Sequence, residues 1–515
     1  MAWSPAFISA LNSGATALVW RLSRINLPYT DNPGSAIAIG SAADSADSWL
    51  VEAPTIAGAG VSPVGWMPQV AATNVSVAVY TRADAQRIAR SLPRGTAVLL
   101  EARTPRASTW EPVFLGTVET MTWVGSQLTM AVRDIRAAIR TRIDTTDGPL
   151  FHELTDDNAV TLGSAYTAGD SSITLSGASY DAFRTNGTAG AILITPSSGD
   201  PFILTYTGRT GATLSGVSST AIVGTTAVNA SGGDAVAPCA YLTGHPFDIA
   251  RRVLASTGSA ANGAYDDYPE SWGLGISDQY MDHADTSLAR QVVTPWPAPS
   301  SPSSYSVVHV VTAAQSSAFD WLAGFLATFG SWMTTRQGRI TFRAATDPKD
   351  ATLASGTTPI RTVNRDEVVE VAEGAVYSSL VGARVYQRTI SYDGGTVSAG
   401  FSLPYTKTFP STTADAVDLT YYTDDSAIAN DVAKRVYRWE GFPPRLYTLV
   451  CTLGVASLCD GDWVALDLDM IGHDQYPSLA LGDAPTTHRR AMVLNVDPDY
   501  RQGLCRIVVG MTSSQ

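Results

Sequence analysis

The stretch most suited to chemistry is NGAYDDYPESWGLG, residues 262–275, in which Asp266 and Asp267 stand side by side between two tyrosines. Glu270 and Trp272 follow shortly after. Glycoside hydrolysis needs paired carboxylates, because one acid protonates the leaving oxygen while another acts as nucleophile or activates water. Turn residues also crowd this stretch, and Asp favours turns by hydrogen-bonding its own backbone. Two interpretations follow, a sugar-cleaving site and a connecting loop.

The spacing of these acids favours the loop. In an extended chain, the side chains of the neighbours Asp266 and Asp267 point to opposite faces, so they could not share one glycosidic bond. Nothing in the sequence fixes Glu270 relative to either of them. We therefore predict an ordered connecting loop whose aromatic residues pack against the central domain. We assign no catalytic residue and expect the protein not to be an enzyme.

Motifs for metals, cofactors and nucleophiles are missing from the sequence. The histidines are scattered and form no H-E-x-x-H pattern, and neither a G-x-S-x-G motif nor a P-loop occurs. Asp282, His283 and Asp285 are close in sequence, but neighbours on one strand or helix do not all converge on one ion. We predict a solvated loop there. No catalytic, cofactor-binding or metal-binding residue, and no cofactor, is expected.

The cysteines are more ambiguous. Cys239, Cys451, Cys459 and Cys505 show no C-x-x-C spacing. A protein made in a reducing cytosol usually keeps such residues as buried thiols, which is the expectation here. A metal or iron–sulfur site and disulfide bonds are the alternatives.

Composition and charge narrow the class of protein. A chain of 515 residues is long enough for several domains, and its low charged fraction of 16% favours strands and turns. The formal charge is −13, without clustered cations, so tight nucleic-acid binding is not expected, while passive passage of DNA remains compatible. No run of about 18 apolar residues occurs. We expect a soluble, unexported chain without stable membrane insertion.

Hydrophobic periodicity divides the chain into four predicted domains. Residues 1–158 form a β-rich domain, because 75–83, 96–104 and 113–134 alternate with the period of strands. The last of these contains two strands joined by a turn at Gly125 and Ser126. Short helices are predicted at 83–92 and 133–143.

The second predicted domain, residues 159–237, is a small all-β insertion module. Its stretch 160–236 carries six charged residues, and short strands such as SSITLSG and FILTYTG alternate with glycine turns. The third, residues 238–365, is a central α+β domain with predicted helices at 245–257 and 318–332, the latter a core helix.

The fourth predicted domain, residues 366–515, is β-rich again. A helix at 425–441 ends at Gly441 before Pro443 and Pro444. Four strands follow it: RLYTLVCTLG, DWVALDLDM, RAMVLNVDP and LCRIVVGM.

Together these segments resemble a baseplate hub, or tail-tip hub, protein of a tailed bacteriophage or gene-transfer particle. The resemblance rests on FLGTVETMTWVGSQLTMAVRD, YDDYPESWGLGI, AFDWLAGFLATFGSWMTTRQGRITF, VAKRVYRWEGFPPRLYTLVCTLG and CDGDWVALDLD. The module separately resembles a small β unit common in phage structural proteins, through its turns at 206–208 and 213–216 and the segment 224–227.

The resemblance implies a fold and a role. It implies a homotrimer in which two tube-like β-barrel domains per chain, residues 1–150 and about 366–515, form a pseudo-sixfold ring. Such a hub joins the sixfold tail tube to threefold tip proteins and lines the channel for DNA ejection. Its implied partners are a distal tail protein ring, a tape-measure protein and central fibre or tip proteins. Its implied location is the virion tail tip, after synthesis in the host cytoplasm.

Two other functions remain open. The first is a receptor- or carbohydrate-binding tail-tip component, in which Tyr265, Tyr268 and Trp272 would be exposed. The second is a cell-wall hydrolase that uses the acids of 262–275.

Overall fold

The structure is a computed structural model of the 515-residue chain. It describes residues 3–13, 18–25, 38–41, 48–50, 53–58, 60–61, 66, 68–79, 81–105, 107–139, 160–177, 180, 183, 190–222, 225–255, 274, 276, 280–282, 306–312, 317–345, 361–372, 385–400, 412–413, 417–441, 445–467 and 488–511.

The N-terminal sheet is built mostly from antiparallel strands in the order β10–β9–β8–β1–β2–β3–β7–β4. Strand β10 also pairs with β7 over seven residue pairs, so the path of pairings returns to its start. The link between β3 and β7 is one residue pair, Leu50 with Val77. The strands are β1 (Val19–Arg24), β2 (Ala38–Ser41), β3 (Ser48–Leu50), β4 (Ile56–Ala57), β7 (Ala72–Ala78), β8 (Ala97–Arg103), β9 (Glu111–Val124) and β10 (Gln127–Asp134).

Three helices accompany this sheet, and side chains cap their first turns. Helix α1 (Pro5–Asn12) has proline in its first turn and is capped by Ser4. Helix α2 (Arg82–Ser91) is capped by Thr81, whose hydroxyl accepts from the Asp84 backbone N–H. Helix α3 (Ile135–Ala138) follows β10 directly and is capped by Asp134.

The C-terminal sheet has the order β21–β28–β29–β30–β27–β22. Two short strands from the N-terminal part, β5 (Gly60–Val61) and β6 (Pro68–Gln69), join it through a pairing of β5 with β29. The other strands are β21 (Arg361–Val363), β22 (Val368–Ala372), β27 (Arg445–Thr452), β28 (Trp463–Asp467), β29 (His488–Asp499) and β30 (Leu504–Met511). Short 3-10 helices lie at Arg365–Glu367 and Leu453–Ser457.

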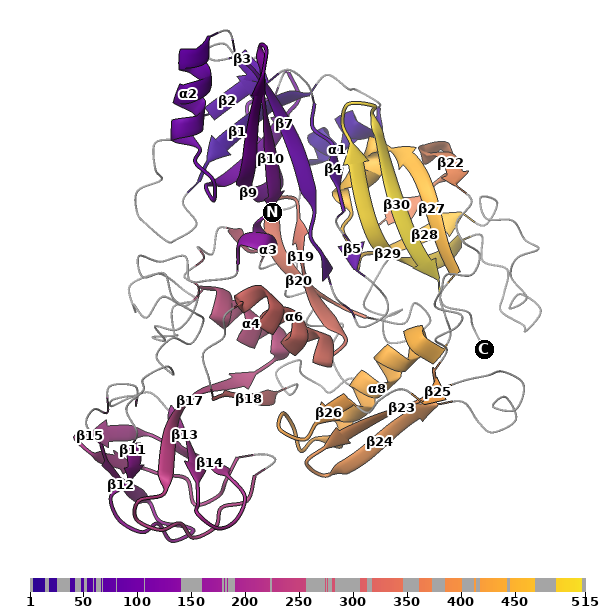
Figure 1. Ribbon diagram of the computed structural model, residues 1–515. Coiled ribbons are helices and arrows are strands. Elements are labelled where there is room, and N and C mark those ends of the chain that lie inside the picture. The colour runs from indigo at the N-terminus through magenta and orange to yellow at the C-terminus, as the bar shows by residue number, and fades with distance from the viewer. Residues whose placement is uncertain are drawn as a thin grey trace.

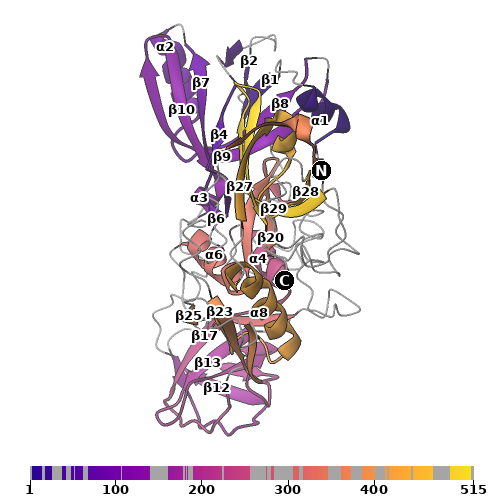
Figure 2. The same cartoon turned by 90° about the vertical axis from the view of Figure 1, so that its right-hand side faces the viewer.

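The two large sheets lie side by side at one end of the molecule (Figures 1 and 2) and share one hydrophobic core. Trp20 and Val98 from the first sheet belong to the same cluster as Val493 and Ile507 from the second. Trp20 also packs edge to face on Tyr500, with ring centroids 4.9 Å apart. Burial of such side chains is the dominant favourable term in folding, so the sheets stabilise each other.

The central part lies below the sheets (Figure 1) and contains α4 (Pro246–Ala255), α6 (Ala318–Thr328) and the hairpin of β19 (Ser331–Arg336) and β20 (Arg339–Ala344). Its core includes Phe247, Leu322 and Phe342 together with Ile390 and Val432 from later in the chain. Those later residues come from a small sheet and a helix. These are β23 (Val385–Tyr392), β24 (Gly395–Gly400), β25 (Thr412–Thr413), β26 (Val417–Leu419) and α8 (Ser426–Gly441).

The insertion module occupies the opposite end from the large sheets (Figures 1 and 2) and has a hydrophobic core drawn from residues 160–236. Its strands are β11 (Val160–Leu162), β12 (Ser172–Ser176), β13 (Gly190–Thr195), β14 (Phe202–Tyr206), β15 (Gly208–Thr210) and β16 (Thr213–Ser215). Strand β17 (Ala235–Gly244) connects the module to the central part. Its first half pairs with β11 and β13, and its second half pairs with β18 (Val307–Val311).

The protein is mainly β with several antiparallel sheets, as the sequence predicts, and the predicted core helix contributes the buried residues Leu322, Phe325, Leu326 and Phe329. This helix ends at Thr328 and not at 332, because Gly330 adopts a left-handed conformation with φ of +60° and β19 begins at Ser331. The described part of the helix predicted at 133–143 is Ile135–Ala138, since residues 133 and 134 continue β10.

The expectation of two β-barrels needs correction. Among the described residues, the ring of paired strands in the N-terminal sheet is joined between β3 and β7 by one residue pair. In the C-terminal sheet, the described end strands β21 and β22 do not pair with each other. Sequence alternation predicts which residues form strands, but closure depends on which edges meet. Among the helices in the described ranges, none combines the length and apolar character needed to span a membrane.

Candidate functional site

The residues that the sequence singles out for chemistry fall mostly outside the described ranges. Asp266, Asp267, Glu270 and the aromatic residues Tyr265, Tyr268 and Trp272 all lie outside them, as do His283 and Asp285. Asp282 is described and is buried, and its backbone N–H donates to the Ile340 carbonyl. The predicted connecting loop at 262–275 therefore stays a prediction.

Two described histidines, His245 and His309, lie at the paired strands β17 and β18. His245 precedes α4, and its Nδ1 accepts from the Phe247 backbone N–H at 3.1 Å. His309 lies on β18 among aromatic rings. Across the ranges that the structure describes, no three His, Cys, Asp or Glu side chains gather as metal ligands.

The four cysteines are buried, free thiols. Cys451 on β27 and Cys505 on β30 are register partners in neighbouring strands. Burial raises the pKa of Cys239 and of Cys451 to about 12, so both are protonated at neutral pH. A thiol is a poor nucleophile and metal ligand compared with a thiolate, which favours a packing role for these side chains.

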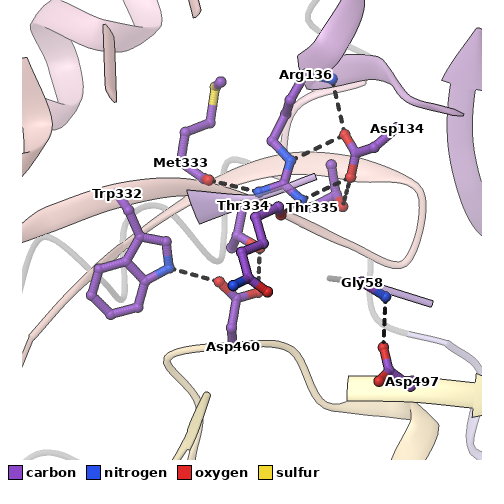
Figure 3. Close-up of polar contacts among 10 residues, drawn as sticks. Gly58, Asp134, Arg136, Trp332, Met333, Thr334, Thr335, Asp460 and Asp497 are labelled. Atoms are coloured by element: carbon purple, nitrogen blue, oxygen red, sulfur yellow. Dashed lines mark hydrogen bonds and ion pairs between the residues drawn. The ribbon is translucent and has the colours of Figure 1, made fainter. Parts of the chain in front are cut away.

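The largest concentration of buried charge lies where the two large sheets meet the central hairpin (Figure 3). Asp134 ends β10, and Arg136 lies two residues later in α3; the side chains of both are fully buried. The guanidinium binds the carboxylate in a bidentate manner, with Nε to Oδ1 at 3.0 Å and Nη2 to Oδ2 at 2.8 Å. It also donates to the carbonyls of Met333 at 3.0 Å and Gln69 at 3.1 Å. One side chain thus connects the first sheet, the strand β6 and the hairpin.

Nearby carboxylates and hydrogen bonds offset the desolvation of this buried pair. Burial opposes the charge of Arg136, but the carboxylates of Asp134 and Asp460 outweigh it, and the pKa of Arg136 is raised above its ordinary value. Thr335 adds a third partner for Asp134, donating to Oδ2 at 3.0 Å. The buried pair therefore has the additional hydrogen bonds that such a pair needs to offset desolvation.

Asp460 approaches the same hairpin from the C-terminal side. Its Oδ2 accepts from Trp332 Nε1 at 2.7 Å, and its Oδ1 accepts from the Thr334 hydroxyl (Figure 3). Burial raises the pKa of Asp460, although Arg136 and these two donors act in the opposite direction. The hairpin residues 332–335 thus face Asp134 on one side and Asp460 on the other.

Two further contacts fasten the hairpin to the C-terminal sheet region. Arg343 on β20 donates to Asp462 Oδ1 at 2.9 Å, and both side chains are largely buried. At the hairpin tip, Gln337 accepts from the Trp3 backbone N–H at 3.0 Å and donates to the Ser457 carbonyl at 3.4 Å. The tip therefore touches residues from both ends of the chain.

A separate strap joins the two large sheets directly. The Gly58 backbone N–H donates to Asp497 Oδ1 at 2.9 Å (Figure 3), and Thr55 forms an isolated bridge with Asp499. Burial raises the pKa of Asp497, and the Gly58 hydrogen bond acts against this shift. Thr55, Gly58 and Gly60, which lie in and around β4 and β5, contact β29 of the second sheet, so N- and C-terminal residues are interleaved here.

These groups, from Asp134 and Arg136 through the hairpin to Asp460, form what we call the polar junction. A cavity of about 60 Å³ beside it is lined by Trp3, Gln337, Asp460 and Tyr500 among others. This volume has room for a few water molecules. It is far below the several hundred cubic ångströms of a small-molecule site. This cavity is therefore too small for a substrate.

Sequence reasoning did not assign these junction residues. A local signal existed, because Asp134 and Arg136 are two residues apart where a predicted strand meets a predicted helix. That spacing suits an N-cap acid that also binds a following arginine. The partners Met333 and Asp460 lie roughly 200 and 320 residues further on, and no local pattern predicts contacts at that separation.

Comparisons with known proteins give remote structural similarities. No protein-family model matches the sequence, and no curated protein matches it. The structure is similar to the 43 kDa tail protein of prophage MuSo2 from Shewanella oneidensis, with 9% identity and a TM-score of 0.38, covering 96% of this chain and 98% of that one. It is also similar to a tail protein from Neisseria meningitidis MC58, with 9% identity and a TM-score of 0.37, covering 96% of both chains.

A third similarity covers a smaller part of the chain. A chain from the virion of a native gene transfer agent particle aligns with 46% of this chain and 84% of its own length, at 16% identity and a TM-score of 0.20. The first two alignments extend over nearly the whole chain and involve phage tail proteins. At TM-scores of at most 0.38, none of the three determines a role for this protein.

Proposed function

We propose that this protein is a structural component of a phage-type tail, and more specifically the hub of a tail tip or baseplate. The observation that carries the proposal is the fusion of two large antiparallel sheets, one from each end of the chain, through one hydrophobic core. A chain that presents two such sheets side by side can supply two neighbouring positions of a ring. Three chains then supply six positions, which suits a join between sixfold and threefold parts.

The polar junction supports a structural role. Asp134 and Arg136 form an ion pair, Asp460 accepts from Trp332 and Thr334, and the hydrogen bonds connect β10, the central hairpin and the region before β28. A ring that transmits force needs a constant angle between its two sheets, and buried, fully bonded networks are rigid. Such a junction suits a scaffold better than a catalytic cleft.

The proposed division of the chain keeps the four domains 1–158, 159–237, 238–365 and 366–515. The first and last would be the two ring domains, each contributing one of the two large sheets. Segment 385–441 would be an excursion from the last domain, because its buried residues join the central core.

The proposed assembly is a homotrimer at the virion tail tip, in contact with a distal tail protein ring, a tape-measure protein and central fibre or tip proteins. Three copies would carry a formal charge of about −39, three times that of one chain. An acidic channel wall repels DNA phosphates, so a genome could pass without the counterion release that fastens DNA to a basic surface. No enzymatic step is part of the proposal.

A reconstruction of the assembled particle, with native mass spectrometry of the purified protein, tests the proposal. We expect a threefold ring whose axial channel is lined by more Asp and Glu than Lys and Arg. Both large sheets of each chain should face that channel. A monomer in the assembled particle would contradict the proposal, as would a ring in which the channel surface is basic.

A further inference from the structure

Exposed apolar side chains gather at two places on the paired sheets. In the part of the chain that the structure describes, five large apolar side chains are exposed, and four of them lie on the two large sheets. Trp123 and Val124, which are 45% and 72% exposed, end β9. Val369 and Val371, which are 62% and 39% exposed, lie on β22. We call the first pair the hairpin patch and the second pair the edge patch.

The hairpin patch lies at the turn between β9 and β10, where Val124 pairs with Gln127. Backbone hydrogen bonds hold this turn against the end of β7. Ala78 pairs with Gln127, and the Val79 N–H donates to the Ser126 carbonyl at 2.8 Å. An exposed tryptophan on a turn that is already ordered loses little conformational freedom when it binds a partner, which favours affinity.

The edge patch lies on an end strand of the C-terminal sheet. Strand β22 pairs with β27 over residues 368–372, with a register shift between Val368 and Glu370. No strand in the described ranges pairs with its other edge. Such an edge presents backbone N–H and C=O groups to another chain, and the exposed valines add apolar area beside them. The edge patch is therefore suited to contact with a protein.

One chain cannot bring the two patches together. The turn of the hairpin patch is bonded to Val79, and α2 begins three residues later at Arg82. Helix α2 lies on the opposite side of the paired sheets from β22 (Figure 1). Two copies of the chain can join the patches, because the hairpin patch of one copy can meet the edge patch of the next.

The charges around the two patches have opposite signs. Segment 82–94, which contains α2, has four exposed arginines and one aspartate, a formal charge of +3. Segment 361–372, which contains β21 and β22, has two arginines and three acids, a formal charge of −1. Glu367 is paired with an arginine inside that segment, whereas Asp366 and Glu370 are exposed. Opposite charges on two surfaces speed their encounter and favour the matching partner.

We propose that the hairpin patch of one copy of this chain docks on the edge patch of a second copy, with Trp123 against Val369 and Val371. The contact is head to tail, because it joins different surfaces of the two copies. A head-to-tail contact closes into a ring when its rotation divides the circle. Three such contacts would cover every hairpin patch and every edge patch in the ring. The inference rests on the proposed hub, since it names the surfaces through which the three copies meet.

Variants that place a charge in one patch test the contact. Trp123→Glu disrupts the hairpin patch and Val369→Glu disrupts the edge patch, so each variant alone should be monomeric where the wild type is trimeric. In an equimolar mixture, one intact contact remains, between the hairpin patch of the Val369→Glu chain and the edge patch of the Trp123→Glu chain. Native mass spectrometry should therefore show dimers with one copy of each variant and no trimer. Both positions are exposed, so circular dichroism should show that each variant folds.

Smaller changes measure the contribution of the tryptophan. Trp123→Ala should raise the dissociation constant of the contact roughly 30-fold or more, as loss of an interface tryptophan commonly does, and Trp123→Phe should raise it less. Tyr421→Ala is the matched control. Tyr421 is the fifth exposed apolar residue and lies between β26 and α8, at the other end of the molecule (Figure 1). Equal dissociation constants for Trp123→Ala and Tyr421→Ala would contradict the assignment.

Cross-linking tests the contacting surfaces directly, in the purified protein and in assembled particles. With Val124→Cys and Val369→Cys in the same chain, a bismaleimide should join copies into covalent dimers and trimers. The native cysteines are buried and should not react. Mass spectrometry should find position 124 of one copy linked to position 369 of another, and neither single variant should form these dimers.

The outcomes separate this contact from the hub itself. Trimers that persist in both charged variants, without links between positions 124 and 369, would overturn the contact and leave a trimeric hub in place. Links from either position to a different protein of the particle would also overturn the contact. A wild-type chain that is monomeric both in solution and in the particle would overturn the proposed hub together with this inference.

Discussion

Replacing Arg136 with methionine should strongly destabilise the contact between the two large sheets. The change removes both hydrogen bonds to Asp134 and those to the carbonyls of Met333 and Gln69, all from a fully buried side chain. It leaves a buried carboxylate with Thr335 and one backbone N–H as partners. Breaking one side of such a buried pair costs about 3–5 kcal/mol.

Hydrogen exchange measured by mass spectrometry is the suitable assay, because a chain with several cores need not unfold in one step. Peptides that cover β10 and β19 should exchange faster by roughly two to more than three orders of magnitude, which corresponds to about 3–5 kcal/mol. Arg133→Met is the matched control. Arg133 also pairs with an acid, Glu119 at 3.2 Å, but both side chains are more than two-fifths exposed. Its removal should cost at most about 1 kcal/mol.

The single variant Asp134→Leu and the double variant with Asp134→Leu and Arg136→Met complete the double-mutant cycle. Because no unpaired charge remains, the double variant should recover part of the loss of the Arg136→Met variant. Equal exchange in Arg136→Met and Arg133→Met would refute the idea that the junction holds the sheets together. Strict additivity of the two junction replacements would refute the pairing.

Four other outcomes are expected. Gly461→Ala should lower the melting temperature more than Gly125→Ala. Both glycines have positive φ, but a Cβ at Gly461 would lie 2.6 Å from Arg343 Cγ. Equal shifts in melting temperature would show that this contact does not destabilise the Gly461→Ala variant. The raised pKa of Asp460 keeps a proton on the folded protein after the unfolded chain has lost it, so the stability of the protein should fall as the pH rises above about 4. Asp460→Asn should make this fall smaller. Urea midpoints measured against pH test this, and an unchanged profile would exclude Asp460 as the group responsible. Iodoacetamide should modify none of the four buried cysteines in the native protein and all of them in urea, as mass spectrometry would show; native labelling would contradict their burial. Replacing 160–234 with a short Gly/Ser linker should leave a soluble oligomer of unchanged mass, and aggregation would show that the module stabilises the body.

Local sequence patterns predict most of the individual elements. The alternation in 113–134 corresponds to β9 and β10 with the turn at Gly125 and Ser126, and the helix predicted at 425–441 corresponds to α8. Such patterns succeed because side-chain burial on one face follows directly from the period of a strand or helix. The hairpin shows where this fails: the helix predicted at 318–332 includes Ser331 and Trp332, the first two residues of β19, because the sequence does not reveal the left-handed conformation of Gly330.

Pairing between distant segments is what the sequence leaves open. The segment that contains Thr55, Gly58 and Gly60 contacts β29, more than 400 residues later, through two backbone pairings and the Gly58 to Asp497 hydrogen bond. Nothing in its composition predicts that partner, because short strands specify register weakly. The same holds for Asp460, which bonds Trp332 and Thr334 from across the junction.

The shared core and the polar junction have different physical roles in the join between the sheets. Apolar contacts such as those around Trp20 and Ile507 are non-directional, so they hold the sheets together without fixing their angle. The hydrogen bonds of Arg136 to the carbonyls of Gln69, in β6 of the second sheet, and of Met333, in the hairpin, are directional, since each N–H must point at its acceptor. Hydrophobic variants in the core should therefore weaken the association of the sheets, whereas junction variants should widen the distribution of angles between them. In a ring built from two sheets per chain, only the wider distribution of angles would disturb the symmetry of the ring while leaving each chain folded.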